Sequence, residues 1–339
     1  MSLTWLLTAT ALMFVATAAA SHALVPVLRR WQMLDMPNAR SSHDRPTPRG
    51  GGIAPVGLLI VAGLGLSIDA QIAGLPALLG AALVLAGLSL VDDRRSVGIV
   101  PRLATHGGAV AFGLAAAVMH WPPILPGLAP GWIVLVLLGI AWLWFMNLFN
   151  FMDGIDGISG VALIGIGLGA AAVVLGQGLT AADSALAGAV CVSGLMLAAA
   201  AAGFLTANWA VARVFLGDVG SIPLGFLAGA LLIALASAGH VAAAMILPAY
   251  HVTDATITLA RRIVRGEKLT EAHRTHAYQR ATQKGLTHAD VCIRIAMLKA
   301  ALVSLALASA AAPLMAVVVA YGLSGMLYHY LLHHERFRR

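Results

Sequence analysis

The densest group of polar side chains in this sequence lies at residues 147–157, which read NLFNFMDGIDG. Asn150, Asp153 and Asp156 follow one another at a spacing that can put side chains on one face of a helix. The two glycines of this stretch permit positive φ or a close approach of the backbone to a ligand. A helix N-cap would use one such carboxylate. It would leave the second carboxylate and the amides unexplained, so the pattern favours a ligand-binding site.

Asp92 and Asp93 form a second acidic group, at the end of an apolar segment. Adjacent carboxylates at the edge of a membrane are costly unless they are paired or bind a metal ion. Pairing with the neighbouring Arg94 and Arg95 explains this spacing as well as a metal or catalytic site does.

Asp218 lies in the segment FLGDVGS, directly before another apolar stretch. A carboxylate at a helix start can hold Mg²⁺ while backbone N–H groups face a phosphate. Phe215 offers an aromatic face on which a flat base could stack. A helix N-cap is the alternative interpretation.

Two basic segments complete the set. Residues 273–280 read HRTHAYQR, and residues 35–52 contain the runs PNARSSH and PTPRGGG. Zinc would need a third ligand near the two histidines, and no Cys or HExxH motif lies nearby. Alternating His and Arg instead suit an anionic diphosphate, and a basic glycine-rich loop can close over phosphates. A lipid-headgroup surface and an ordinary positively charged loop are the respective alternatives.

The elements that must position these residues are membrane helices. The chain has 339 residues, of which 60% are hydrophobic and 10% charged, whereas soluble domains carry about 25% charged residues. We predict an all-α polytopic integral membrane helical bundle that forms a single domain over residues 1–339. Crossing the hydrocarbon takes about 20 apolar residues. We therefore expect about eleven spans, at residues 3–26, 53–69, 74–91, 103–120, 131–149, 158–176, 184–203, 220–237, 240–259, 293–311 and 313–332.

The charge pattern predicts the topology. No Lys or Arg precedes the first apolar run, and Arg29 and Arg30 follow it, which indicates an uncleaved span with a periplasmic N-terminus. All 21 Lys and Arg residues then fall in or near connections on the cytoplasmic side, which also receives the C-terminus. The five polar clusters face that side together. The net charge of +7 suits anionic headgroups and phosphates, and we expect no nucleic-acid partner.

The motifs, in this order, resemble the polyprenyl-phosphate N-acetylhexosamine-1-phosphate transferase superfamily, glycosyltransferase family 4, which includes MraY-, WecA- and TagO-like enzymes. The resemblance covers nearly the whole chain and looks closest to the WbpL-like branch, which starts O-antigen-type chains. MraY-like enzymes carry a run of adjacent histidines where this chain has His273-Arg-Thr-His276. That departure argues against the peptidoglycan precursor as the substrate.

The resemblance implies a Mg²⁺-dependent transfer, with Mn²⁺ as a second possible ion, from a UDP-sugar to undecaprenyl phosphate in the bacterial inner membrane. The family is often dimeric, so a homodimer is also an expectation. Asp218 and Asp92 would be the metal ligands. The catalytic residues would be Asp92, Asp93, Asp153, His273 and His276. The substrate-binding residues would be Asn150, Asp156, Asn208, Phe215, His43, Arg49, Arg274 and Arg280.

Three other function classes remain open at this point. A transporter of an anionic substrate would normally bury its polar residues near the bilayer midplane, often within inverted repeats, and no internal repeat is visible in the sequence. A non-catalytic lipid-binding scaffold would tolerate the loss of Asp218. The CDP-alcohol phosphotransferases use a longer, wider-spaced aspartate pattern, which this sequence lacks.

Overall fold

The computed structural model describes residues 2–37, 44–69, 74–95, 97–127, 129–176, 184–268 and 273–334. Within them the chain forms helices and a single two-stranded hairpin. The elements are α1 (Leu3–Arg30), β1 (Leu34–Asp35), β2 (Thr47–Pro48), α2 (Ile53–Asp69), α3 (Leu75–Arg94), α4 (Ile99–His120), α5 (Gly131–Phe151), α6 (Ile158–Gly176), α7 (Ser184–Asn208), α8 (Asp218–Ser237), α9 (Val241–Ile246), α10 (Ala249–Val264), α11 (Ala277–Gln283), α12 (His288–Ala308) and α13 (Pro313–His333).

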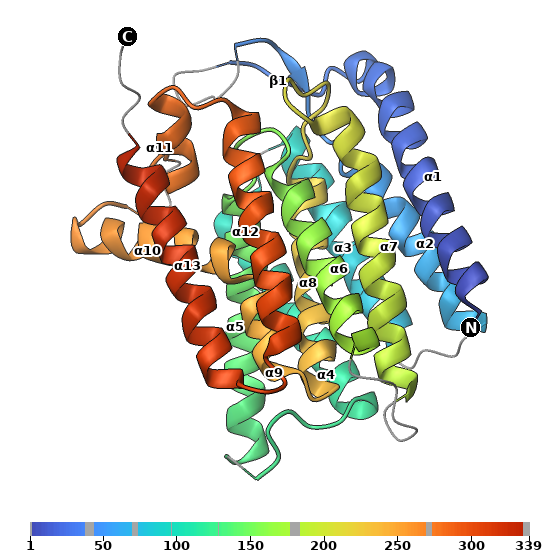
Figure 1. The fold of residues 1–339 in the computed structure, drawn as a ribbon. Coiled ribbons are helices and arrows are strands. Elements are labelled where there is room, and N and C mark those ends of the chain that lie inside the picture. Colours follow the sequence, from blue (N-terminus) through green and yellow to red (C-terminus); the bar gives the residue numbers. More distant parts are fainter. Residues whose placement is uncertain are drawn as a thin grey trace.

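The long helices form one bundle and run along a common direction (Figure 1). In the described part of the chain, 9 helices are long and apolar enough to cross a membrane, and α2 is a shorter apolar helix. The predicted all-α polytopic bundle is confirmed. The chain begins toward one end of the bundle, and α13 ends toward the other, next to α11 and at the end that carries the hairpin (Figure 1).

Helix α8 is the centre of the bundle. It packs against α3, α5, α6, α7 and α9, and its side chains are almost all buried. Small residues permit this close approach, as is common between helices in lipid. At Gly229 a side chain would collide with the indole of Trp142, whose Nε1 donates to the Phe226 carbonyl at 2.9 Å. Asp218 therefore opens the most buried long helix of the fold.

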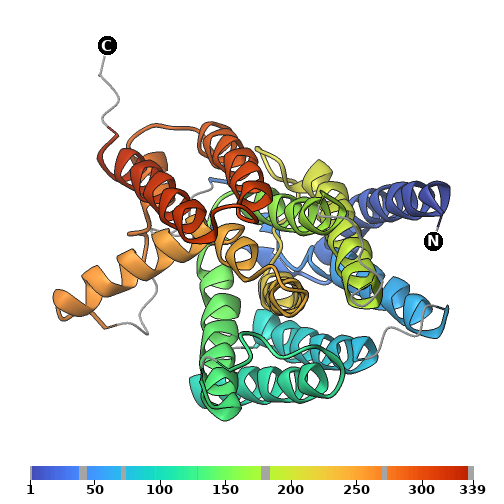
Figure 2. The ribbon, with the colours of Figure 1, turned by 60° about the horizontal axis from the view of Figure 1, so that its bottom comes forward.

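The predicted span at 240–259 is wrong as a single helix. The structure has two helices there, α9 and α10, with a break at Leu247 and Pro248. Proline has no N–H to continue the helical ladder, and Lys299 Nζ donates to the Leu247 carbonyl at 2.7 Å. Helix α10 then extends sideways, away from the other helices (Figures 1 and 2). Its Asp254 is buried, whereas Val264 near its end is 88% exposed.

The first loop is anchored to the start of α8. Strands β1 and β2 pair antiparallel, and Phe215 donates its N–H to the Pro48 carbonyl at 2.8 Å. The Phe215 carbonyl in turn accepts hydrogen bonds from Gly50 and Gly51. A side chain at Gly52 would collide with the Gly220 backbone. Glycine at this position thus permits the contact that places Arg49 beside Asp218.

Candidate functional site

Asp218 is the point at which four elements meet. Its Oδ1 lies 2.8 Å from Arg49 Nη2, next to β2, and 3.2 Å from Asn150 Nδ2, at the end of α5. Its Oδ2 lies 3.4 Å from Arg102 Nη2, near the start of α4. Asn150 also donates to Ser221 Oγ at 2.7 Å. Residues distant in the sequence thus converge on one carboxylate at the end of the bundle that carries the hairpin.

The adjacent carboxylates of α3 have different surroundings. The Asp93 side chain is 1% exposed and accepts the N–H groups of Asp218 and Val219 at 3.3 and 3.0 Å. These groups open α8, and the N-cap residue Gly217 has no side chain with which to accept them. Arg49 Nε lies 2.9 Å from the same carboxylate. Asp93 therefore caps the central helix from a neighbouring one, a role that the sequence did not reveal.

Asp92 is held by another arginine. Its Oδ2 lies 3.0 Å from Arg102 Nη1, and its Oδ1 accepts the Val97 N–H at 2.7 Å. Arg102 therefore bridges Asp92 and Asp218. The alternative of local pairing with Arg94 and Arg95 is wrong for the described residues, in which the arginine partners of Asp92 and Asp93 are Arg102 and Arg49. The Arg94 guanidinium instead lies 5.3 Å from the centre of the Trp31 ring.

Asp153 lies in the turn between α5 and α6. The Ser159 hydroxyl donates to its Oδ1. Burial raises the pKa of Asp153 to about 7, the Ser159 hydrogen bond and Arg49 oppose that rise, and Asp218 adds to it. Asp153 is therefore within electrostatic reach of the Asp218 cluster, and it changes charge near neutral pH.

The expectation that Asn150, Asp153 and Asp156 share one helical face is wrong. Helix α5 ends at Phe151, and α6 begins at Ile158, so the turn sends the three side chains to different partners. Gly157 has φ of 84°, as the sequence pattern allowed.

Asp156 and Asn208 hold a second part of the site. Asp156 Oδ2 accepts the Ala212 N–H at 3.1 Å and lies 3.2 Å from His288 Nδ1. Asn208 accepts the Gly157 N–H at 3.0 Å and donates to the Val214 carbonyl at 2.9 Å. These bonds join the Asp153 turn to the loop that leads to Phe215. Phe215 itself is half-buried.

The histidine segment forms a third part. Burial, and after it the neighbouring His276, lowers the pKa of His273 to about 4, so the ring is neutral at physiological pH. The Thr275 N–H lies 3.4 Å and the Thr275 Oγ1 2.8 Å from His273 Nδ1, and an Nδ1 that accepts this N–H leaves the ring proton on Nε2. Arg274 and Arg280 are half-buried on either side of the start of α11.

His276 is in a different position from the one expected. It is 2% exposed, and its Nδ1 lies 3.3 Å from Asp254 Oδ1. The phosphate contact inferred from the resemblance would need an accessible ring, so this geometry gives His276 a supporting position instead. His43, the remaining predicted residue, lies outside the described residues.

The donor chemistry of the site fits a magnesium ion. No group of three His, Cys, Asp or Glu side chains arranged to hold a metal ion occurs among the residues that the structure describes. Asp92 and Asp218 nevertheless face the same guanidinium, that of Arg102. Carboxylate and amide oxygens with water are the ligands that Mg²⁺ takes. Asp218 and Asp92 are therefore the residues that would hold it, with Asn150 beside them.

Sequence reasoning missed Arg102, His288 and Asp254. A signal existed for two of them. Arg102 is the only Lys or Arg between Arg95 and Arg213, and Asp254 is the only acidic residue between Asp218 and Glu267. A lone charge inside an apolar stretch indicates a functional or paired group. His288 had no comparable signal.

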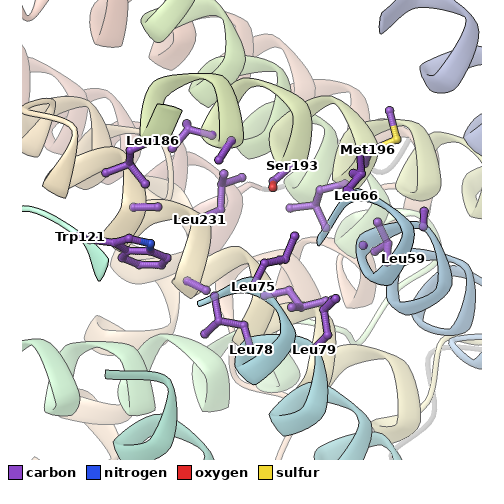
Figure 3. A pocket seen from close by; sticks show the side chains of 18 residues that line it. Leu59, Leu66, Leu75, Leu78, Leu79, Trp121, Leu186, Ser193, Met196 and Leu231 are labelled. Atoms are coloured by element: carbon purple, nitrogen blue, oxygen red, sulfur yellow. The ribbon is translucent and has the colours of Figure 1, made fainter. Parts of the chain in front are cut away.

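A separate apolar cavity lies between α2, α3, α7 and α8 (Figure 3). Leucines make up half of its lining, and Trp121 and the single hydroxyl of Ser193 also face it. Its α8 residues begin at Leu227, more than two turns beyond Asp218. It contains none of the charged residues of the site, so its chemistry does not suit a nucleotide.

Comparisons with known proteins agree with the motifs. The model of glycosyl transferase family 4 matches residues 75–236, a stretch that contains all the acidic side chains converging on Asp218. The chain belongs to this family. A Streptomyces coelicolor protein described as a glycosyltransferase is 33% identical over 82% of this chain and 65% of its own length. The chain thus spans somewhat less than two thirds of that relative.

Two other relatives carry more specific names. The decaprenyl-phosphate N-acetylglucosaminephosphotransferase of Mycobacterium leprae is 29% identical over 85% of this chain and 79% of its own length. The phospho-N-acetylmuramoyl-pentapeptide-transferase of a Synechococcus strain is 34% identical over 62% of this chain and 64% of its own length. These names and the family match together support the superfamily of polyprenyl-phosphate hexosamine-1-phosphate transferases for this chain.

Proposed function

We propose that this chain transfers a sugar 1-phosphate of the N-acetylhexosamine type from a UDP-sugar to undecaprenyl phosphate and releases UMP. The convergence of Asp92, Asn150 and Asp218 with Arg49 and Arg102 carries the proposal. A lipid phosphate that attacks a diphosphate brings two anions together. A site for this reaction must therefore combine cationic groups with ligands for a divalent ion, and this cluster supplies both.

Different residues of the site would have different roles. Arg49 and Arg102 would screen the repulsion between the two reactants. Asp218 and Asp92 would hold Mg²⁺, which when bound neutralises charge on the diphosphate. Asp156, Asn208 and Phe215 would bind the uracil, and Asn150 and Asp153 would lie beside the ribose and phosphates. Neutral His273 would donate Nε2–H to a phosphate oxygen, next to Arg274 and Arg280.

A general base contributes little to this reaction. A phosphate monoester has its second pKa at about 6, so most of the lipid phosphate is already a dianion at neutral pH. Asp93 is fully engaged by Arg49 and two N–H groups, which favours a positioning role. Asp92 remains the better candidate for contact with the reactants. The pH–rate profiles of Asp92→Asn and Asp93→Asn test this, because near-normal rates at high pH with failure at low pH would support a base.

The identity of the sugar is a finer proposal. UDP-GlcNAc and its 6-deoxy relatives UDP-FucNAc and UDP-QuiNAc differ by a hydroxyl group or its configuration, so discrimination rests on one or two hydrogen bonds. The WbpL-like character of the histidine segment supports a role at the start of O-antigen or another surface polysaccharide. The Synechococcus relative supports a second candidate, the peptidoglycan precursor. We place the site at the cytoplasmic face of the bacterial inner membrane because the positive charges gather there.

The test uses purified protein with Mg²⁺, undecaprenyl phosphate and a panel of UDP-sugars that includes the peptidoglycan precursor. Released UMP is measured. We expect turnover with at least one sugar, its loss in Asp218→Asn, and its retention in the matched control Asp44→Asn, which alters an exposed acid of the first loop. Flux of the anionic substrate across vesicles without UMP release would support a transporter instead.

A further inference from the structure

Asp254 of α10 is a fully buried carboxylate with an unusually large set of hydrogen-bond donors. It is 0% exposed. A buried carboxylate is costly unless donors satisfy its oxygens. Here the donors are Ala277 N at 3.0 Å, Tyr278 N at 3.3 Å, Tyr250 Oη at 3.1 Å, Thr258 Oγ1 at 3.2 Å and His276 Nδ1 at 3.3 Å.

Two of these donors are the first N–H groups of α11. The N-cap residue of this helix, His276, makes no side-chain hydrogen bond to the helix start. Asp254 supplies the missing acceptor from another helix, as Asp93 does for α8. The two helices that carry the predicted motifs FLGDVGS and HRTHAYQR thus begin in the same way, each on a buried aspartate of a neighbouring helix.

Helix α11 in turn holds the acidic turn. Tyr278 Oη donates to the Phe151 carbonyl at 3.0 Å, just before Asp153. A side chain at Gly154 would collide with Tyr278 Oη, so glycine is required for this contact. On the other side, the rings of His273 and His276 lie 4.9 Å apart. A shift of the start of α11 would therefore move both His273 and the Asp153 turn.

We propose that Asp254 is a positioning residue of the transfer site, whose buried carboxylate caps α11 and thereby fixes His273 and, through Tyr278, the Asp153 turn. The proposal rests on the proposed function. To the residues of the proposed function it adds Asp254 of α10, which none of the predicted motifs includes. Asp156 and Asn208 are held instead by α12 and by the loop after α7. The loss of Asp254 should therefore affect the chemical step more than the binding of the nucleotide.

The first experiment compares the kinetics of Asp254→Ala, Asp254→Asn and the matched control Thr258→Val in the purified full-length protein. Thr258→Val removes one donor to Asp254 and leaves α11 untouched. In Asp254→Ala we expect kcat to fall at least about tenfold while KM for the UDP-sugar changes less than about threefold. In Asp254→Asn the amide oxygen still accepts one N–H of α11, so kcat should recover to within about threefold of wild type. The kcat of Thr258→Val should stay within about twofold of the wild-type value.

The second measurement is hydrogen–deuterium exchange of residues 273–283, which needs no turnover. We expect exchange there to be at least about tenfold faster in Asp254→Ala than in wild type or Thr258→Val. Tyr278→Phe keeps the cap but loses the Phe151 contact, so it should retain slow exchange and still lose kcat. If Asp254→Ala cannot be purified as a folded protein, kcat and hydrogen–deuterium exchange in Asp254→Asn and Tyr278→Phe decide the question.

Unchanged exchange in Asp254→Ala, equal kcat in Asp254→Ala and Thr258→Val, or a change confined to KM would overturn the proposal. Wild-type protein without transfer activity would instead refute the proposed function. The exchange comparison would then still decide whether Asp254 caps α11.

Discussion

Asp92 and Asp93 show how neighbours give the same residue type two roles. Asp93 is 1% exposed in its side chain and caps α8, whereas Asp92 is 11% exposed and pairs with Arg102. Sequence reasoning identified the pair but could not separate its members. The partners come from β2, α4 and α8, and no local pattern predicts such distant contacts.

We expect Asp93→Ala to destabilise the protein by about 2 kcal/mol, because it removes a helix cap and leaves Arg49 without its most buried partner. The 38% exposure of Arg49 keeps this figure below that of a fully buried pair. Asp92→Ala should cost less than about 1 kcal/mol, because Arg102 is 33% exposed and keeps Asp218 as a partner. Thermal unfolding in detergent measures both, and equal losses would contradict the capping role.

The pKa of Asp153 predicts a pH dependence of activity. Burial raises the pKa to about 7, so the carboxylate is mostly protonated at pH 6 and mostly ionised at pH 8. If the ionised form is the active one, kcat/KM should rise about tenfold over that interval. Ser159→Ala should shift this rise to higher pH, because the Ser159 hydrogen bond lowers the pKa. Asp153→Asn should be slow and lack the rise, and an unchanged rise in that variant would assign it to another group.

At the scale of the helices, the hydrophobic runs predicted most spans well. They failed at residues 240–259, because the mean hydropathy of a segment does not show that Pro248 and the buried Lys299 interrupt the helix there. Hydropathy also cannot tell that α8 is central, since α5 is equally apolar and much more exposed. The glycines of α8 carry that information, but only their contacts reveal it.

We expect Gly229→Ala in α8 to destabilise the bundle by about 1–3 kcal/mol, because the added methyl group would collide with Trp142. Gly80→Ala in α3 is the matched control. A side chain at Gly80 would have no neighbour within 4 Å, so the higher helix propensity of alanine should leave stability equal or slightly higher. Unfolding midpoints in one detergent compare the two, and a neutral Gly229→Ala would argue against the close packing of α8.

For the whole molecule, the fold brings together motifs that the sequence could only place on the same side. The all-α architecture was predictable from the apolar runs, and the order of the motifs can be read from the sequence itself. The links between the motifs were not, because Arg102, Asp254 and His288 are isolated residues within helices or at their starts.

The orientation in the membrane can be tested with introduced cysteines, because both native ones, Cys191 and Cys292, are buried. Val211 lies near the site and its native side chain is 84% exposed, so Val211→Cys should be accessible from that side. Pro126→Cys lies in the exposed connection between α4 and α5, which we place on the periplasmic side. We expect a membrane-impermeant maleimide to label Pro126→Cys in intact spheroplasts and Val211→Cys only after permeabilisation. The reverse pattern would invert the topology.

The proposed role of the Asp218 cluster is to join a lipid phosphate to a sugar phosphate. One diphosphate linkage is broken and another is made, so the reaction should run close to equilibrium in both directions. The most direct measurement is the exchange of radiolabelled UMP into the UDP-sugar by the purified protein. We expect exchange that needs Mg²⁺ and undecaprenyl phosphate and that disappears in Asp218→Asn. Exchange that persists in Asp218→Asn, or none in a wild-type protein supplied with both, would contradict it.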